Sequence, residues 1–213
     1  MKGLRERKKA ATRQAISDIA TRLFQERGFE QVTVAEIAEA AGVSVKTVFN
    51  YFGSKEDLFF DRADELLGAM LTALRERPPG VSPTAALRPG LLAGPIPYTD
   101  LPWSGLQRPE VYERIRRFVE CERSSPALTA RRLVIAQSWA ERLGAEAGSD
   151  AWAAMFVGVL NLRARVYGDA ILERRAARTI ERRVRAAIEP ALDALERGFA
   201  AVAETGRAAR RIA

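Results

Sequence analysis

Histidine is absent from the 213 residues, and Cys121 is the only cysteine. Catalytic pairs of the Ser-His-Asp or Cys-His type need a histidine, so the sequence excludes them. A zinc site built from cysteine and histidine needs three or four such ligands and is excluded too. A disulfide within the chain would need a second cysteine. We therefore expect no enzyme, no metal and no cofactor. We expect Cys121 to be an inert core residue, and a redox sensor is the alternative.

Long apolar runs are also absent. The longest candidate, Ala151–Leu162, is shorter than the roughly 18 residues of a membrane-spanning helix. The basic N-terminus lacks the apolar core of a secretion signal. We therefore expect a cytoplasmic protein without a membrane-spanning segment.

Positive charge is in excess, with a formal net charge of +7. The first 55 residues hold ten Lys or Arg against six Asp or Glu, and they hold all five lysines. Such a distribution favours an anionic partner, either nucleic acid or a membrane surface. A membrane surface would need a basic face opposite bulky apolar residues, whereas the last predicted helix mixes both signs of charge.

Runs of β-branched residues are scarce, and alanine, leucine, arginine and glutamate dominate, which predicts an all-α fold. Eight of the ten prolines lie in the segment 78–109, where we expect an irregular loop around one short helix at 84–92. Apolar periodicity and end signals predict the other helices at 5–27, 33–41, 45–52, 54–77, 109–123, 126–147, 149–175 and 178–204.

A helix-turn-helix is predicted near the N-terminus. Thr33 and Glu36 have the spacing of a capping box, which begins a short helix that ends before Gly42. Ser44 then caps a third helix. Two short helices joined by a turn around a glycine describe this motif.

The third helix is predicted to have two faces. Val45, Val48, Phe49 and Phe52 fall on one arc, which we expect to be buried. The opposite side carries the polar groups Lys46, Thr47, Asn50 and Tyr51. Such groups can bond base edges and phosphates in a DNA groove, although an ordinary solvated helix face would have a similar composition.

The spacing of many residues between Ala15 and Leu58 resembles the N-terminal domain of the TetR family of bacterial transcriptional regulators. The matching residues are Ile16, Ile19, Ala20, Leu23, Phe24, Glu26, Gly28, Phe29, Thr33, Val34, Ile37, Ala38, Ala41, Gly42, Val43, Ser44, Thr47, Val48, Phe49, Tyr51, Phe52, Lys55, Glu56 and Leu58. The resemblance implies a three-helix DNA-binding domain at 1–53 and a larger helical domain at 54–213 for ligand binding and dimerisation.

The resemblance also implies phosphate contacts by Thr33, Tyr51 and Lys55. The predicted DNA-binding set is Thr33, Ser44, Val45, Lys46, Thr47, Asn50, Tyr51 and Lys55. The basic residues Lys2, Arg5, Arg7, Lys8, Lys9 and Arg13 form an N-terminal arm. We expect that arm either to follow the DNA backbone or an adjacent minor groove, or to be a solubilising tail.

The last predicted helix has an apolar stripe. Its members are Ile180, Val184, Ala187, Ile188, Ala191, Leu195, Gly198, Phe199 and Val202. The resemblance implies that the last two helices form a four-helix bundle across a two-fold dimer. Packing of the stripe within its own subunit is the alternative.

Two charged residues fall on apolar faces, Arg163 and Glu122. A buried charge needs a partner, so either they pair with each other or with neighbours, or they reach the surface. The alternative is that Arg163 faces an acidic ligand with Trp152, Phe118 or Trp139 nearby.

The sequence therefore predicts a homodimeric regulator, most simply a repressor, which binds a palindromic DNA operator and is released by a small molecule. The fourth predicted helix, 54–77, would be the lever between the two domains. A structural DNA-binding protein with the same motif and no ligand control is the alternative.

Overall fold

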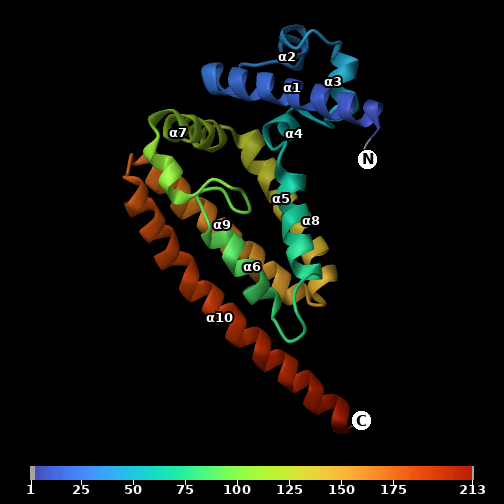
Figure 1. The fold of residues 1–213 in the computed structure, drawn as a ribbon, viewed down its shortest axis with the longest axis vertical. Helices are drawn as coiled ribbons and strands as arrows, with labels where there is room; N and C mark the ends of the chain where they lie inside the picture. The colour runs from blue at the N-terminus through green and yellow to red at the C-terminus, as the bar shows by residue number, and fades with distance from the viewer. Residues whose placement is uncertain (1–2, 213) are drawn as a thin grey trace. The chain divides into compact units, whose positions relative to one another are not determined.

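Ten α-helices and one short 3₁₀ helix make up the part of the chain that the computed structural model describes, residues 3–212, and no strand occurs in that part (Figure 1). Side chains are described for residue 3 and residues 5–198. The predicted all-α fold is confirmed. Within the described residues, no helix combines the length and the apolar character that crossing a membrane requires.

The helices follow one another along the chain without long gaps. Their bounds are α1 Leu4–Arg27, α2 Val34–Ala40, α3 Val45–Tyr51, α4 Lys55–Phe59, α5 Ala63–Arg75, α6 Pro83–Leu92, η1 Trp103–Gln107, α7 Pro109–Ser124, α8 Pro126–Ala147, α9 Asp150–Leu172 and α10 Ala177–Ile212. The short helix predicted in the proline-rich segment is present as α6, with Pro83 in its first turn and Pro89 inside it.

The chain forms two compact units. The first contains Met1–Ala63 and Arg117–Leu133, and the second contains Asp64–Arg116 and Val134–Ala213. The helices α7 and α8 therefore each contribute residues to both units. This division into units does not test the predicted domains at 1–53 and 54–213, which remain a prediction.

An aromatic cluster fills the core of the first unit. The Phe24 and Phe29 rings lie 5.1 Å apart, and the Phe59 ring lies 6.0 Å from each of them. Phe118 of α7 stacks on Phe59 at a centroid distance of 4.3 Å. Distant parts of the sequence thus share one core, which aromatic rings stabilise through their large buried area and edge contacts.

The predicted single helix at 54–77 is wrong, because α4 ends at Phe59 and α5 begins at Ala63. The local sequence contains no proline or glycine at this point, so the cause is tertiary. The Arg13 guanidinium donates to the backbone carbonyl of Asp61 at 3.0 Å, and the Ser17 hydroxyl donates to the Asp61 carboxylate. These contacts with α1 thus keep residues 60–62 from continuing the helix.

In the second unit, the segment that follows α6 folds back on that helix. The Tyr98 hydroxyl donates to the Leu87 carbonyl at 2.8 Å, and a Cβ added at Gly90 would lie 2.3 Å from the Tyr98 ring. Only glycine leaves room for that ring. The Trp103 indole N–H donates to the Leu92 carbonyl at 3.0 Å, so side chains from the loop cover the carbonyl end of α6.

The apolar stripe of α10 packs against other residues of the same chain. Ile180, Val184 and Ile188 are fully buried, and Leu195 is nearly so. Packing within the same unit therefore accounts for the stripe up to Leu195, and the stripe gives no support to a dimer. Phe199 and Val202 lie outside the residues whose side chains are described.

Candidate nucleic-acid interface

The predicted capping box at the start of α2 is present. The Glu36 backbone N–H donates to the Thr33 hydroxyl at 3.2 Å, and the Thr33 N–H donates to the Glu36 carboxylate at 2.8 Å. Arg27 of α1 pairs with the same carboxylate at 2.7 Å. The Thr33 N–H and the Arg27 guanidinium lower the pKa of Glu36 to about 2. The box thus fixes where α2 begins and ties it to the end of α1.

We expect this carboxylate to make the first unit sensitive to acid. Because folding depresses the pKa of Glu36, its contribution to stability is present above the ordinary glutamate pKa of 4.5 and is lost as the pH falls toward about 2. Thermal unfolding between pH 5 and pH 2 should therefore depend on pH more steeply in the wild type than in Glu36→Gln. Equal slopes in the two proteins would contradict the assignment. Glu39→Gln, on an exposed residue of the same helix, is the control.

A tight turn joins α2 to α3. Gly42 has a φ of +65°, in the left-handed region that glycine tolerates best. The Val43 N–H donates to the Ala38 carbonyl at 2.9 Å, and this bond closes the end of α2. Ser44 then caps α3, since its hydroxyl accepts from the Thr47 N–H at 3.0 Å. Helix, turn and helix therefore follow the predicted order, as Figure 1 shows.

Only half of the predicted buried face of α3 is buried. Val48 and Phe52 join the core, whereas Val45 is 39% exposed and Phe49 is 50% exposed. At 100° per residue, Val48 and Phe52 lie about 40° apart, and Phe49 lies about 60–100° away from them around the helix. The side of α3 that packs is thus narrower than the predicted arc, and it is centred on Val48 and Phe52.

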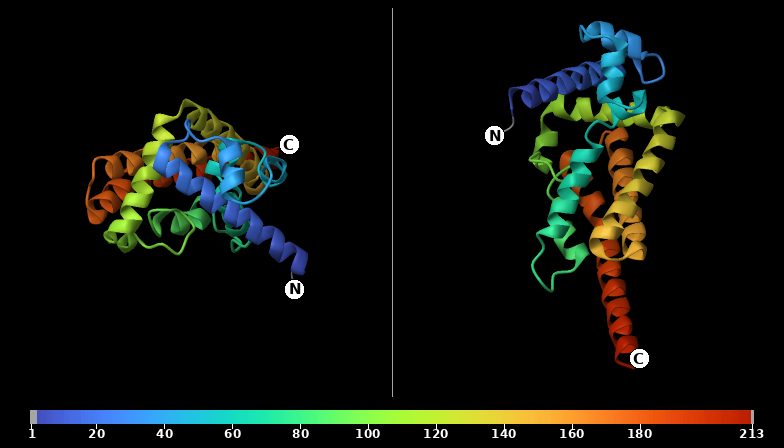
Figure 2. Two further views of the ribbon diagram at one scale, coloured as in Figure 1. Left: turned by 90° about the horizontal axis from the view of Figure 1, so that it is seen from above. Right: turned by 90° about the vertical axis from the view of Figure 1, so that its right-hand side faces the viewer.

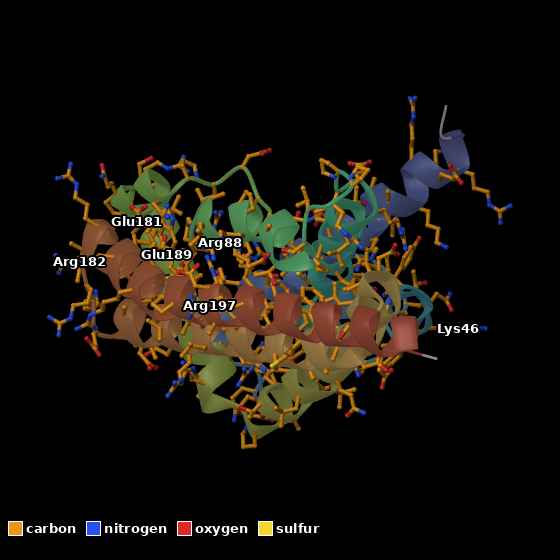
Figure 3. The ribbon with its side chains drawn as sticks, turned by 90° about the horizontal axis from the view of Figure 1, so that it is seen from below. Lys46, Arg88, Glu181, Arg182, Glu189 and Arg197 are labelled. Carbon is orange, nitrogen blue, oxygen red and sulfur yellow. The ribbon has the colours of Figure 1, made fainter. Side chains whose placement is uncertain are left out.

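The polar side of α3 faces solvent. Lys46 and Asn50 are exposed, and Thr47 and Tyr51 are half-buried. Figure 3 shows Lys46 projecting away from the ribbon. Phe49 is an exposed aromatic side chain on the same short helix, so the prediction that it is buried is wrong. No local signal in the sequence marks this exposure, because it depends on which other helices approach α3.

Thr33, Ser44 and Lys55 each lie at a helix start. Thr33 and Ser44 are exposed, and Lys55 opens α4 after the N-cap Ser54. The Lys55 ammonium lies 4.2 Å from the centre of the Phe29 ring. The predicted DNA-binding set therefore divides between an outward side of α3 and three helix N-termini of the same unit. A free N-terminal amide and the helix dipole both favour an anion at such points.

A distant segment completes this unit, and sequence reasoning missed it. Arg131 of α8 donates to the Asp57 carboxylate of α4 at 2.9 and 2.5 Å. Ser125 is buried, and its hydroxyl donates to Glu30 at 2.5 Å. Cys121 is buried too, where its thiol donates to the Phe24 carbonyl at 3.6 Å and burial raises its pKa. These contacts attach the α7–α8 corner, residues 117–133, to the helices around the motif.

The residues predicted to bind a ligand are divided between the two units. Phe118 belongs to the first unit, where it stacks on Phe59. Trp152 is buried in the second unit, stacked on Phe156 at 4.9 Å, and its indole N–H donates to the Thr84 hydroxyl at 2.9 Å. Trp139 is half-buried on α8. These contacts give Phe118 and Trp152 ordinary packing roles.

Arg163 and Glu122 do not pair with each other. Glu122 pairs with Arg132 at 3.1 Å, and burial raises its pKa. Arg163 is 3% exposed and donates to three backbone carbonyls: Leu91 at 3.1 Å, Gly94 at 2.6 Å and Pro95 at 3.2 Å. Each residue thus has partners of its own.

Burial lowers the pKa of Arg163 to about 10, so the guanidinium stays charged near neutral pH. Its positive charge lies where the carbonyls at the end of α6 point, and the dipole of that helix favours a cation there. Arg163 therefore holds the segment after α6 against α9. One turn further along α9, the buried Tyr167 hydroxyl has no hydrogen-bond partner among the described residues.

Comparison with known proteins places the motif in a family. Residues 16–61 match the family model of the bacterial regulatory proteins of the tetR family. The HTH-type transcriptional regulator TcmR of Streptomyces glaucescens is 40% identical over 85 residues, which are 40% of this chain and 38% of TcmR. The HTH-type transcriptional repressor AcnR of Corynebacterium glutamicum is 40% identical over 65 residues, which are 30% of this chain and 35% of AcnR. These matches thus span less than half of each relative.

A solved structure extends the likeness of fold beyond the motif. NalD, the secondary repressor of the MexAB-OprM multidrug efflux pump in Pseudomonas aeruginosa, superposes with a TM-score of 0.52 at 18% identity. The superposition covers 87% of this chain and 96% of NalD. At that identity the likeness concerns the fold alone. The helix-turn-helix segment, residues 16–61, therefore matches the tetR family of bacterial regulatory proteins.

Proposed function

We propose that this chain is a cytoplasmic transcriptional regulator that binds duplex DNA as a homodimer, acts as a repressor and is released by a small molecule. The observation that carries the proposal is the α2–Gly42–α3 motif, with both helices capped and Lys46 and Asn50 of α3 exposed, inside the segment that matches the family model. The relatives with known roles are named as transcriptional regulators and repressors, which supports the same function here.

In this proposal α3 enters the major groove. Asn50 can bond adenine with its amide, Thr47 offers a hydroxyl or a methyl group, and Lys46 can reach guanine or a phosphate. The exposed Phe49 and Val45 would contact thymine methyl groups. Thr33, Ser44, Tyr51 and Lys55 would hold phosphates on either side and so fix the position of α3.

The proposed dimer would use the solvent-facing side of the last two helices. On α9, the residues Ala151, Ala154, Met155 and Gly158 share one exposed side, and Met155 is 53% exposed. Small residues with one large apolar side chain allow a second helix to approach closely. A two-fold dimer places two copies of α3 on two half-sites, so the DNA sequence should be palindromic.

The dimer is tested with a charge on this side of α9. We expect wild-type protein to sediment as a dimer at micromolar concentration, and Met155→Arg to sediment as a monomer, because a guanidinium cannot be buried there without a partner. Val134→Arg, at an equally exposed apolar residue of α8, is the matched control and should stay dimeric. A monomeric wild type would contradict the proposal.

Selection from a random duplex library tests the function as a whole. Purified protein should enrich a palindromic sequence and bind it at least 100-fold more tightly than a random duplex, as specific DNA-binding proteins do. Enrichment of no sequence would favour the alternative of a structural DNA-binding protein. The three carbonyls that occupy Arg163 support that alternative as well, because this guanidinium already has partners without a ligand.

Release of DNA by a small molecule requires an effector site. We place this site in the second unit, near Arg163, Trp152 and Trp139, whereas Phe118, the fourth predicted contact, belongs to the first unit and is left out of the proposed site. A ligand there would release DNA by favouring a dimer whose two α3 helices no longer match successive grooves. Ligand and DNA must then weaken each other by the same factor.

A further inference from the structure

Arg13 of α1 differs from the basic residues that precede it in the N-terminal arm. Residues 5–11 are all exposed, whereas Arg13 is half-buried. Figure 2 shows the first turns of α1 running clear of the other helices of the first unit, and α1 passing close to α3 and α4 further along. Arg13 therefore lies where α1 meets its neighbours, and its charge is not part of a solvated tail.

The Arg13 guanidinium contacts two points of the chain that lie on either side of α4. Its central carbon is 4.7 Å from the centre of the Phe52 ring, and one of its N–H groups donates to the Asp61 carbonyl at 3.0 Å. Phe52 is the C-cap of α3, and Asp61 lies in the break that follows α4. One side chain of α1 thus holds both ends of the segment 52–61.

This pair of contacts uses the planar shape of a guanidinium. The face of the plane can lie over an aromatic ring while the N–H groups at its edge donate to an oxygen. Lysine carries its charge on a compact ammonium, and an apolar side chain has no donor, so neither can make both contacts in the same way. The residue type at position 13 therefore suits a joint between α1, the end of α3 and residues 60–62.

The contact with Phe52 acts on the last turn of α3. The Phe52 N–H donates to the Val48 carbonyl at 3.0 Å, and both side chains are buried in the core of the first unit. A helix of seven residues has little stability of its own, so its direction depends on what holds its two ends. Ser44 caps the first end, and Arg13 packs on the second.

We propose that Arg13 is a positioning residue for DNA reading, which sets the direction of α3 through Phe52 and Asp61 and makes no contact with DNA itself. The inference rests on the proposed function, and it takes Arg13 out of the N-terminal arm. A side chain distinguishes one base from another only when it reaches the base edge in the correct geometry, so a shift of α3 weakens a specific sequence most. Binding to phosphates depends on charge and changes little.

Four variants separate positioning from charge and from stability. Arg13→Met keeps a side chain over the Phe52 ring but loses the charge and the donor, whereas Arg13→Lys keeps the charge without the planar fork. Ser17→Ala removes the hydroxyl that donates to the Asp61 carboxylate, one turn further along α1, and leaves the Arg13 contacts in place. Arg22→Met changes an exposed arginine about 180° around α1 from Arg13 and is the charge-matched control.

The experiment measures binding to a library-selected duplex and to a random duplex between about 50 and 300 mM salt, below the unfolding temperature of every variant. Arg13→Met should lose about tenfold or more of its affinity for the selected duplex, which is the effect of one mismatched base pair. It should keep the affinity and, within about 0.3, the salt slope of Arg22→Met on the random duplex. Arg13→Lys should lose less on the selected duplex without matching the wild type. Ser17→Ala should keep the wild-type ratio of the two affinities.

Three results would overturn the inference. A salt slope that is lower by about 0.9 in Arg13→Met, with equal losses on both duplexes and full recovery in Arg13→Lys, would make Arg13 a phosphate contact. The same loss on the selected duplex in Ser17→Ala would mean that any loosening of this core weakens reading. A wild-type ratio of affinities in Arg13→Met would mean that the contact with Phe52 only stabilises the fold.

Amide hydrogen exchange of the free protein tests the position of α3 even if selection enriches no sequence and the proposed function fails. The Phe52 N–H should exchange several-fold faster in Arg13→Met than in the wild type, because the end of α3 loses the group that packs on it. The Val43 N–H, which closes α2, should exchange at the wild-type rate. Unchanged exchange at Phe52 would show that Arg13 does not hold the end of α3.

Discussion

A protein with Lys46→Ala and Tyr51→Phe is expected to lose operator binding at about 150 mM salt, by at least 100-fold, while its unfolding temperature stays within a few degrees of the wild type. Lys46 is exposed, so its truncation leaves no cavity. Tyr51 is half-buried and packs against the core of the first unit, so phenylalanine keeps the packing and removes only the hydroxyl. Each lost contact to a base or phosphate typically costs about 1–3 kcal/mol of binding free energy, and a two-fold dimer loses each contact twice.

The control for this double variant changes a cation on a different helix. Arg182 is exposed on α10 and projects into solvent in Figure 3. Arg182→Ala removes the same charge as Lys46→Ala and should leave operator affinity within about twofold. The measurement is a gel shift, or fluorescence anisotropy, with a library-selected duplex. Full affinity in the double variant would show that α3 is not the recognition helix.

Replacing Arg163 with methionine is expected to lower the free energy of unfolding by about 3 kcal/mol. Methionine fills a similar volume and needs no charge partner, but the carbonyls of Leu91, Gly94 and Pro95 then lose their donor. A buried carbonyl left without a partner costs about 1–3 kcal/mol, and the three share one site, so their costs do not simply add. For a chain of this length, the shift in unfolding temperature should be about 8 °C.

Two further substitutions make this result interpretable. Arg182→Met changes an exposed arginine and should stay within about 0.5 kcal/mol of the wild type. Arg163→Lys keeps the charge but offers no planar fork, so it should fall between the wild type and Arg163→Met. Chemical denaturation followed by circular dichroism measures all three. An Arg163→Met protein as stable as the wild type would mean that Arg163 does not hold the segment after α6.

Local signals in the sequence were sufficient to predict the helix-turn-helix. The capping residues Thr33 and Ser44 lie where predicted, because an N-cap acts on amides only two or three residues away. The glycine turn at Gly42 is local in the same sense. These signals depend on neighbours in the sequence, so they can be read without knowledge of the rest of the fold.

Features set by distant contacts could not be predicted in this way. The break between α4 and α5 depends on Arg13 and Ser17, which lie more than forty residues earlier than Asp61. The partners of Arg163 are backbone carbonyls about seventy residues away. Every residue has such a carbonyl, so the sequence does not indicate which ones accept these hydrogen bonds. The sequence showed that Arg163 falls on an apolar face, but not what neutralises it. The exposure of Phe49 likewise depends on which helices approach α3.

The corner at residues 117–133 has a consequence for how the protein is made. Phe118, Cys121 and Leu128 belong to the same core cluster as Phe24 and Phe59, and the 53 residues from 64 to 116 separate the two parts in sequence. The ribosome synthesises the helix-turn-helix long before it reaches Leu133. Until residues 117–133 have been made, one side of the core of the first unit stays uncovered. Closing that core must overcome the entropy of a long loop, which slows folding. DNA-binding competence should therefore appear late in translation, although the motif itself lies in the first quarter of the chain.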